Sequence, residues 1–319
     1  MSMIIRAAGP LARPLRARLY STEARKSTVS RYLVPVTGVL AAAFLYHHLT
    51  QGEAEQAKPH KIMTSPLDPQ NYIDIKLKRV EPYNHNTSKF VFDLGEGKAS
   101  LLPVTSFVFL RAEDFKDVNG KPMQRPYTPI SPPDLEGELT FVVKNYETGN
   151  VSKHIHSLKP GDKLAVKGLC QNGPGRFDEV GLIGGGSGIT PLYQLLHHAL
   201  ADETNRTKFK LIFANVTEAD ILLREEFDAM KRKYPSNFDV VYVLDKPPAD
   251  WNGPSGYVNA NLIKQQFAPP ALGDKVKIFV CGPPPQVASV AGKKDGPRQG
   301  ELSGILKELG YTPDQVFKF

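Results

Sequence analysis

The sequence predicts a two-domain fold. An antiparallel six-stranded β-barrel is followed by a doubly wound α/β domain with a parallel sheet, and a transmembrane helix precedes both. Three patterns support this prediction. Residues 32–49 carry no Asp, Glu, Lys or Arg. Residues 70–175 alternate apolar and polar positions in short runs, as antiparallel strands do. Residues 176–319 alternate strand-like and helix-like segments, as α/β domains do.

Residues 1–30 have the composition of a mitochondrial targeting segment. The first 22 residues hold four arginines and no acidic residue, with several Ser, Ala and Leu. That composition is typical of a mitochondrial presequence and favours mitochondria over secretion.

Residues 31–49 predict a membrane anchor. Tyr32–Leu49 is 18 residues long, and at about 1.5 Å per residue such a helix spans roughly 27 Å, close to the thickness of a bilayer core. The alternative is the apolar core of a secretory signal. No small-residue cleavage site follows Leu49, and residues 50–69 form a polar linker. We therefore expect a single anchor in a mitochondrial membrane, in the first place the outer membrane, with a processed intermembrane-space form as the alternative.

The net charge of +7 does not indicate a nucleic-acid-binding surface. Residues 1–50 contain seven basic residues and one acidic residue, so the totals of 40 and 33 leave 33 basic and 32 acidic residues for the rest. Cys170 and Cys281 are the only cysteines, too few for a disulfide framework or a cysteine-based zinc site. We expect neither a metal nor a nucleic-acid partner.

The first folded domain is predicted over residues 70–175. Short runs of β-branched and aromatic residues, bounded by Gly and Pro, predict its strands. One short helix, near Ser152–Leu158, interrupts them. The runs are IDIKLKRV (73–80), KFVFDL (89–94), VTSFVFL (104–110), ELTFVVKNY (138–146) and DKLAVKGL (162–169).

The second domain is predicted over residues 176–319, with a boundary near 173–178. Strand–helix alternation at this spacing implies right-handed crossovers and a parallel sheet. The segments are GLIGG then LYQLLHHAL, KLIFANV then ILLREEFDAMKRKY, FDVVYVLD then NLIKQQF, and KIFVCG then a Gly-Lys-rich loop and ELSGILKEL.

Two motifs of the first domain carry groups suited to a diphosphate. RPYTPIS (125–131) offers a guanidinium fork and an aromatic side chain on a backbone that its prolines stiffen. GNVSKH (149–154) follows a predicted strand, and Ser152 is the expected N-cap of a helix whose free N–H groups form an anion site. Taken singly, these are also compatible with an exposed strand edge and an ordinary capped helix. Together they predict both ends of a diphosphate clamp.

Two motifs of the second domain lie where α/β sheets bind ligands. GGGSGITP (184–191) joins a strand to a helix, and its glycines let the backbone approach phosphates. It is not the Rossmann fingerprint, because Ile189 stands where that pattern needs glycine. CGPPP (281–285) ends a hydrophobic strand, where a small polarisable side chain can lie against a flat ring. A tight turn and an inert buried cysteine are the structural alternatives.

These four motifs, in this order and spacing, resemble the ferredoxin–NADP reductase superfamily and, more closely, its NADH–cytochrome b5 reductase branch. The resemblance covers residues 70–319. The arginine-rich start, the single anchor and the Gly-Lys loop before VFKF are most similar to the fungal mitochondrial members. The resemblance implies an FAD-binding barrel (70–175) and an NADH-binding α/β domain (176–319). Hydride would pass from NADH to FAD, and single electrons from FAD to cytochrome b5 or a similar haem protein.

The resemblance also implies roles for individual residues. Tyr127, Thr128 and Cys281 are the expected catalytic residues beside the reacting rings. Asp245 would face the adenosine ribose, where a carboxylate favours NADH over NADPH. Asn150 stands where the family commonly has a cation. The residues expected to bind FAD are Arg125, Tyr127, Thr128, Lys144, Tyr146, Asn150, Val151, Ser152 and Thr190; those expected at NADH are Gly185, Gly186, Ser187, Gly188, Asp245, Cys281, Gly282 and Pro283, with Phe319 as the terminal aromatic.

The sequence is also compatible with two other functions. A reductase for a quinone or another acceptor is the main alternative, because surface loops decide the acceptor. A membrane-anchored scaffold without turnover is less favoured, since every cofactor-facing motif retains its chemistry. His85 matches a family histidine near a proton path, although a surface-loop histidine is the simpler interpretation. We expect a monomer.

Overall fold

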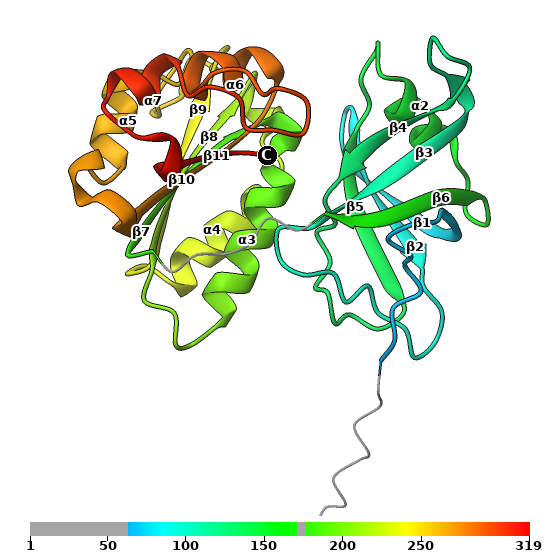
Figure 1. The fold of residues 1–319 in the computed structure, drawn as a ribbon. Coiled ribbons are helices and arrows are strands. Elements are labelled where there is room, and N and C mark those ends of the chain that lie inside the picture. Colours follow the sequence, from blue (N-terminus) through cyan, green and yellow to red (C-terminus); the bar gives the residue numbers. More distant parts are fainter. Residues whose placement is uncertain (1–62, 171–176) are drawn as a thin grey trace, which may run out of the picture. The chain divides into compact units, whose positions relative to one another are not determined.

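The computed structural model describes residues 63–170 and 177–319. The predicted targeting segment (1–30), anchor (31–49) and most of the linker (50–69) lie outside the described residues. Within the part of the chain that is described, no helix has the length and hydropathy that a membrane span requires. The described residues belong to one compact unit, in which a β domain is followed by an α/β domain (Figure 1).

The first domain is a six-stranded antiparallel sheet, as predicted. Its spatial order is β4-β3-β6-β1-β2-β5, with every neighbouring pair antiparallel. The sheet surrounds a core in which Phe90, Phe92 and Phe141 are almost completely buried. The elements are β1 (Ile73–Asn84), β2 (Thr87–Asp93), β3 (Phe107–Lys116), β4 (Pro122–Tyr127), β5 (Glu138–Lys144), α2 (Asn150–Ser157) and β6 (Lys163–Cys170).

The sixth strand, β4, lacks the alternating pattern of the other five, and the sequence indicated it only as the strand-edge alternative for RPYTPIS. Its central residues, Gln124, Arg125 and Pro126, are all exposed, so the strand lacks an apolar alternation. It forms by pairing with β3, where Arg125 lies opposite Leu110, and its edge position tolerates proline. Strand β3 starts three residues later than predicted, because Thr105 has a φ of 67° that interrupts the extended backbone.

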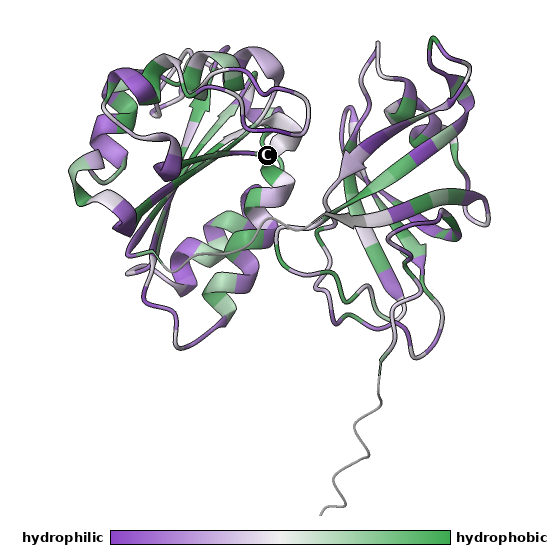
Figure 2. Ribbon diagram, viewed as in Figure 1, coloured by the Kyte–Doolittle hydropathy of each residue, from purple (hydrophilic) through white to green (hydrophobic). Residues whose placement is uncertain are grey.

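The second domain is a parallel five-stranded sheet in the order β11-β10-β7-β8-β9, which confirms the predicted architecture. Leu182 and Ile183 are neighbours in β7 and enter different buried clusters, so helices cover both faces. The central strands are strongly hydrophobic (Figure 2). The elements are β7 (Glu179–Gly185), η1 (Gly186–Gly188), α3 (Ile189–Ala201), β8 (Lys208–Asn215), η2 (Glu218–Asp220), α4 (Arg224–Lys233), β9 (Phe238–Leu244), α5 (Ala260–Gln266), η3 (Pro270–Lys275), β10 (Val276–Cys281), α6 (Pro284–Ala291), α7 (Gly304–Glu308), η4 (Pro313–Gln315) and β11 (Val316–Lys318).

Among the helices that differ from the prediction, α6 and α4 do so for a clear physical reason. No helix was expected between KIFVCG and the Gly-Lys-rich loop, yet α6 begins at the second of the three prolines that follow Gly282. Two of those prolines occupy the first helical turn, where no intrahelical N–H bond is lost. Helix α4 begins at Arg224, later than the apolar run suggested, because the preceding Leu223 has a φ of 56°.

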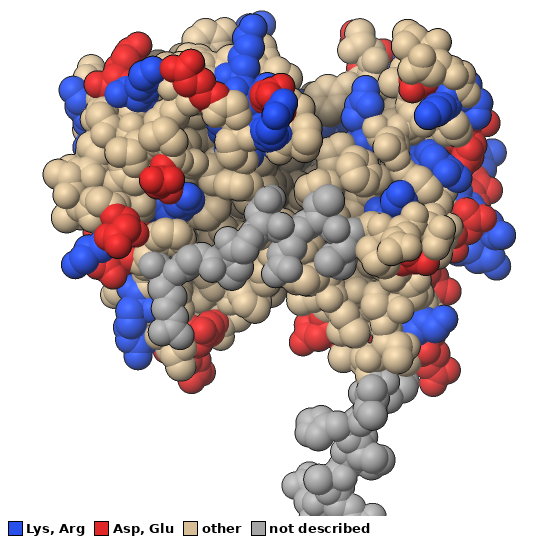
Figure 3. Space-filling model, in the orientation of Figure 1, with Lys and Arg blue, Asp and Glu red and all other residues tan. Residues whose placement is uncertain are grey.

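Charges of both signs are interspersed on the face drawn in Figure 3. This distribution agrees with the near balance of basic and acidic residues outside the first 50. One group of opposite charges joins β1 to β5. Arg79 donates a hydrogen bond to the Glu138 carboxylate at 2.7 Å, and Lys78 donates another at 2.8 Å. The hydrogen bond from Arg79 has the largest effect on the pKa of Glu138 and the one from Lys78 the next largest, and together they lower this pKa to about 2.

A buried lysine attaches the loop after α6, residues 292–303, to the last strand. Lys318 is 2% exposed, and its ammonium donates to the carbonyl oxygens of Ala291 at 3.2 Å, Lys293 at 3.4 Å and Glu301 at 3.1 Å. Gln299 adds two hydrogen bonds, donating to the Lys318 carbonyl and accepting from its N–H. Loop 292–303 is therefore held beside the C-terminus.

Replacing this ammonium should destabilise the domain. We expect Lys318→Met to lower the free energy of unfolding by about 2 kcal/mol, because three carbonyl groups lose a buried donor. Urea unfolding followed by circular dichroism measures the change. Lys307→Met is the control, since Lys307 forms an exposed ion pair with Glu301, and such pairs contribute about 0–1 kcal/mol. Equal effects of the two substitutions would contradict the assignment.

Candidate functional site

Two cavities lie where the end of β5 meets the carboxyl ends of the parallel strands. The larger has a volume of about 920 Å³ and the smaller about 530 Å³, both in the range of cofactor pockets. Lys144, Tyr146 and Pro283 line both cavities. A single elongated ligand could therefore occupy the two together.

The β domain supplies Tyr127 and Thr128, both predicted site residues, to the larger cavity. Tyr127 ends β4, and its ring packs edge-on against Phe141 at 6.4 Å between centroids. Burial raises the pKa of the Tyr127 hydroxyl well above its ordinary value. This hydroxyl is therefore a neutral hydrogen-bond donor at physiological pH.

The α/β domain supplies the turn after β7 and the end of β10. Gly185, Ser187, Gly188 and Thr190 line the larger cavity together with Cys281. A Cβ atom at Gly188 would lie 2.6 Å from the Cys281 carbonyl oxygen, so only glycine permits this approach of the two backbones.

The cysteine beside this turn is a neutral thiol. Burial raises the pKa of Cys281 to about 12, and the nearby Lys294 ammonium reduces the rise. Since a thiolate is the nucleophilic form, Cys281 supplies shape and polarisability rather than covalent chemistry. Gly282 and Pro283 complete this side of the larger cavity.

Aromatic side chains and loop 292–303 form another side of the larger cavity. Phe319 lines the larger cavity, its ring 5.8 Å from that of Phe279, and its N–H donates to the Val280 carbonyl at 3.0 Å. Lys294 and Gln299 of the loop line the same cavity. The terminal aromatic residue thus lines the same cavity as Cys281 and Thr190.

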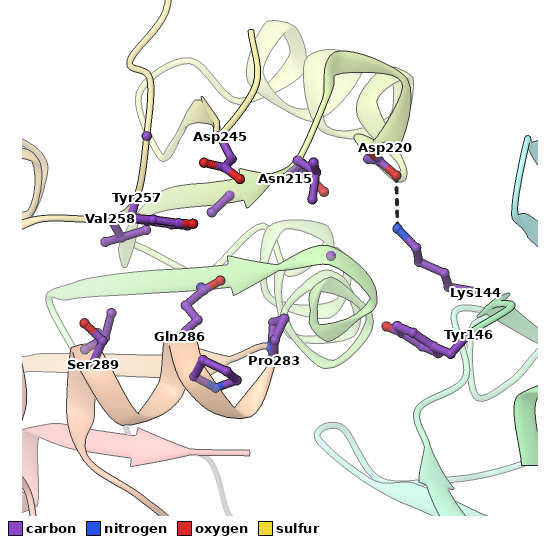
Figure 4. Close-up of a pocket in the computed structure, with 16 residues that line it drawn as sticks. Lys144, Tyr146, Asn215, Asp220, Asp245, Tyr257, Val258, Pro283, Gln286 and Ser289 are labelled. Carbon is purple, nitrogen blue, oxygen red and sulfur yellow. Dashed lines mark hydrogen bonds and ion pairs between the residues drawn. The ribbon is translucent and has the colours of Figure 1, made fainter. Parts of the chain in front are cut away.

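The smaller cavity is lined by an aromatic ring, that of Tyr257, and by the carboxylate of Asp245 (Figure 4). Asp245 directly follows β9, and its N–H donates to the Asn215 carbonyl at 3.0 Å. Tyr257 is 78% exposed and presents a flat ring on which a base can stack. Gly186, which belongs to the turn after β7, also lines this cavity.

Four predicted residues lie outside the lining of both cavities: Arg125, Asn150, Val151 and Ser152. Helix α2 packs against β4, with the Asn150 amide nitrogen 2.9 Å from the Met123 sulfur. Arg125 is exposed, and one guanidinium nitrogen donates to the Gln124 carbonyl at 2.8 Å. The two motifs are thus neighbours, as a diphosphate clamp requires.

Two details of this clamp differ from the prediction. The N-cap of α2 is Gly149, not Ser152, because the turn that joins the Gly149 N–H to the Tyr146 carbonyl starts the helix earlier. Ser152 is buried in the first helical turn, and Val151 is 2% exposed in the core, so its side chain supports the helix.

Sequence reasoning missed two buried amides in the smaller cavity. Asn215 is 8% exposed, and neither polar atom of its side chain has a hydrogen-bond partner among the described residues; the same holds for the Gln286 amide nitrogen. Gln286 packs so closely on Gly185 that a Cβ there would lie 2.1 Å from its amide oxygen. Asn215 is the last residue of β8, and parallel sheets present ligand-binding groups at the carboxyl ends of their strands. This position in the sequence could have identified Asn215 as a site residue.

The residues present fit FAD and NADH. The larger cavity joins neutral donors, a small thiol and aromatic rings, as a flat ring system needs. The unpartnered amides and the carboxylate of the smaller cavity suit a nucleotide's hydroxyl and phosphate groups, because buried polar groups normally have partners. Arg125 and the start of α2 would hold the FAD diphosphate. The architecture and site define an oxidoreductase with one flavin-binding and one dinucleotide-binding domain.

Comparison with known proteins supports this class. Residues 74–173 match the oxidoreductase FAD-binding domain, and residues 182–292 match the oxidoreductase NAD-binding domain. The fold is similar to the cytochrome b5 reductase domain of Ulva prolifera nitrate reductase, with a TM-score of 0.69 and 24% identity over 80% of this chain and all of that one.

Curated relatives identify the family. The chain is 41% identical to NADH-cytochrome b5 reductase 2 of Aspergillus terreus, over 97% of each chain. It is 46% identical to the protein of that name from Mycosarcoma maydis, over 79% of this chain and 74% of the relative. The chain belongs to the NADH-cytochrome b5 reductase family, and it is an FAD-dependent oxidoreductase that uses NADH.

The unpartnered amides should contribute to dinucleotide binding. We expect Gln286→Met, which keeps the side-chain length, to weaken ADP-ribose binding about fivefold, because one hydrogen bond contributes about 1 kcal/mol. Isothermal titration calorimetry measures this affinity, and because ADP-ribose has no nicotinamide, no reaction takes place during the titration. Gln265→Met on the exposed side of α5 is the control. Unchanged affinity in the Gln286 variant would remove this residue from the site.

Proposed function

We propose that this protein transfers electrons from NADH to cytochrome b5, or to a similar small haem protein, while anchored to a mitochondrial membrane. The observation that carries the proposal is the meeting of the two cavities at Lys144, Tyr146 and Pro283. It allows one NADH molecule to bind its adenosine in the smaller cavity and bring its nicotinamide into the larger one.

The residues act by binding and orientation. Bound FAD would supply the change from a two-electron hydride to single electrons. Thr128 and the neutral Tyr127 hydroxyl would hold the ring system from the β domain, while Cys281 and Gly188 would position the nicotinamide from the α/β domain. Holding both reactants in one geometry is the main contribution that such a protein makes to hydride transfer.

Asp245 would select NADH over NADPH. A carboxylate can accept hydrogen bonds from ribose hydroxyl groups, and it repels a 2′-phosphate. Asp245→Ser removes this repulsion, so we expect the ratio of kcat/KM for NADPH to that for NADH to rise at least tenfold. Steady-state kinetics with both nucleotides measures it. If the use of NADPH does not rise, Asp245 does not face the ribose.

The N-terminal composition supports the proposed location. Four arginines and no acid in the first 22 residues, followed by the apolar stretch Tyr32–Leu49, are typical of a mitochondrial protein with a single anchor. We place it in the outer membrane, with a processed intermembrane-space form as the alternative, and as a monomer. Carbonate extraction of isolated mitochondria tests the anchor, because an anchored chain stays in the pellet.

The acceptor is tested with purified protein. The names of the relatives support cytochrome b5. We expect NADH-dependent reduction of cytochrome b5, followed as the change in haem absorbance, at a kcat/KM at least tenfold above that for a soluble quinone. The reverse order would favour a quinone reductase. Protein purified without a flavin absorbance band would favour a scaffold.

A further inference from the structure

The junction of the two cavities is crossed by two polar contacts between the domains. Lys144, at the end of β5, places its ammonium 3.0 Å from a carboxylate oxygen of Asp220 (Figure 4). The Tyr146 hydroxyl lies 2.6 Å from the Ser187 hydroxyl. A dinucleotide with a base in each cavity must pass its diphosphate through this junction.

Lys144 is the one cation available to that diphosphate in the smaller cavity. Among the described residues that line this cavity, it is the only Lys or Arg, whereas Asp220 and Asp245 supply two carboxylates. Its ammonium is already paired with Asp220. An incoming diphosphate therefore has to compete with a carboxylate for the only Lys or Arg among the described residues of this cavity's lining.

Asp220 is held firmly without Lys144. Its second carboxylate oxygen accepts from the Thr217 N–H at 3.1 Å and from the Thr217 hydroxyl at 2.7 Å. Burial acts to raise the pKa of Asp220, but the hydrogen bonds from Thr217 and Lys144 outweigh it and lower the pKa, so the group is ionised. His85 lies 3.8 Å from the oxygen that Lys144 contacts. Lys144 can leave while the carboxylate keeps its other donors.

We propose that Asp220 is a positioning residue that holds the Lys144 ammonium at the junction and releases it to the diphosphate of the entering dinucleotide. The exchange makes binding of NADH the event that opens the contact between β5 and the turn Glu218–Asp220. It depends on NADH binding alone, so a different electron acceptor would leave it unaffected.

Asp220→Asn tests the exchange. Asparagine can still accept from Thr217, but it carries no charge and no longer retains Lys144. We expect ADP-ribose to bind the detergent-solubilised, FAD-loaded full chain three- to tenfold more tightly, and the KM for NADH to fall in proportion without a rise in kcat. Lys144→Met should weaken ADP-ribose binding at least tenfold. In the Lys144→Met background, Asp220→Asn should change the Kd less than twofold.

Two controls separate the exchange from other effects. Glu218→Gln removes a carboxylate of the same turn that bonds Arg224 rather than Lys144, so it should leave the Kd unchanged. Adenosine, which has no phosphate, should bind all variants equally. Weaker ADP-ribose binding in Asp220→Asn would overturn the proposal in favour of a structural role. Equal tightening with and without Lys144 would overturn it in favour of general charge repulsion.

Discussion

The close approach of two backbone segments at the carboxyl edge of the parallel sheet is the constraint on which the site depends. The turn after β7 passes so near the end of β10 that a side chain at Gly188 would collide with the Cys281 carbonyl. Parallel strands deliver their carboxyl ends to one edge, and glycine lets two of those ends come together. Thr190 and Cys281 therefore line the same cavity although 91 positions separate them in sequence.

The second requirement is that the two domains stay aligned. Besides the contact of the Tyr146 hydroxyl with Ser187, the Tyr83 hydroxyl accepts from the Leu223 N–H at 2.8 Å, and Lys89 pairs with Glu226 at 3.1 Å. These bonds join β1 and β2 to the start of α4. Hydride transfer needs its two rings at a defined separation, and here each ring would be held by a different domain. The polar contacts at the interface therefore bear directly on the chemistry.

The C-terminus is part of this arrangement. Lys318 is buried with carbonyl partners, and Phe319 follows it into the larger cavity. Loop 292–303 is held by the same lysine and lines the same cavity through Lys294 and Gln299. This loop, which contains no helix or named strand, is thus positioned by the buried ammonium of Lys318 together with the two hydrogen bonds of Gln299.

Sequence alone determined the class of each domain, because the two-residue alternation of strands and the strand–helix succession are local signals. The glycine turn and Cys281 were located by their place at the ends of recognisable strands, and Asp245 and Phe319 by the resemblance to a family; all four line the two cavities. Only the tertiary structure decided that β4 is a strand, that Gly149 caps α2, and that Asn215, Gln286 and Asp220 face the smaller cavity. Those properties depend on which distant segments meet, and no local pattern of residues specifies that.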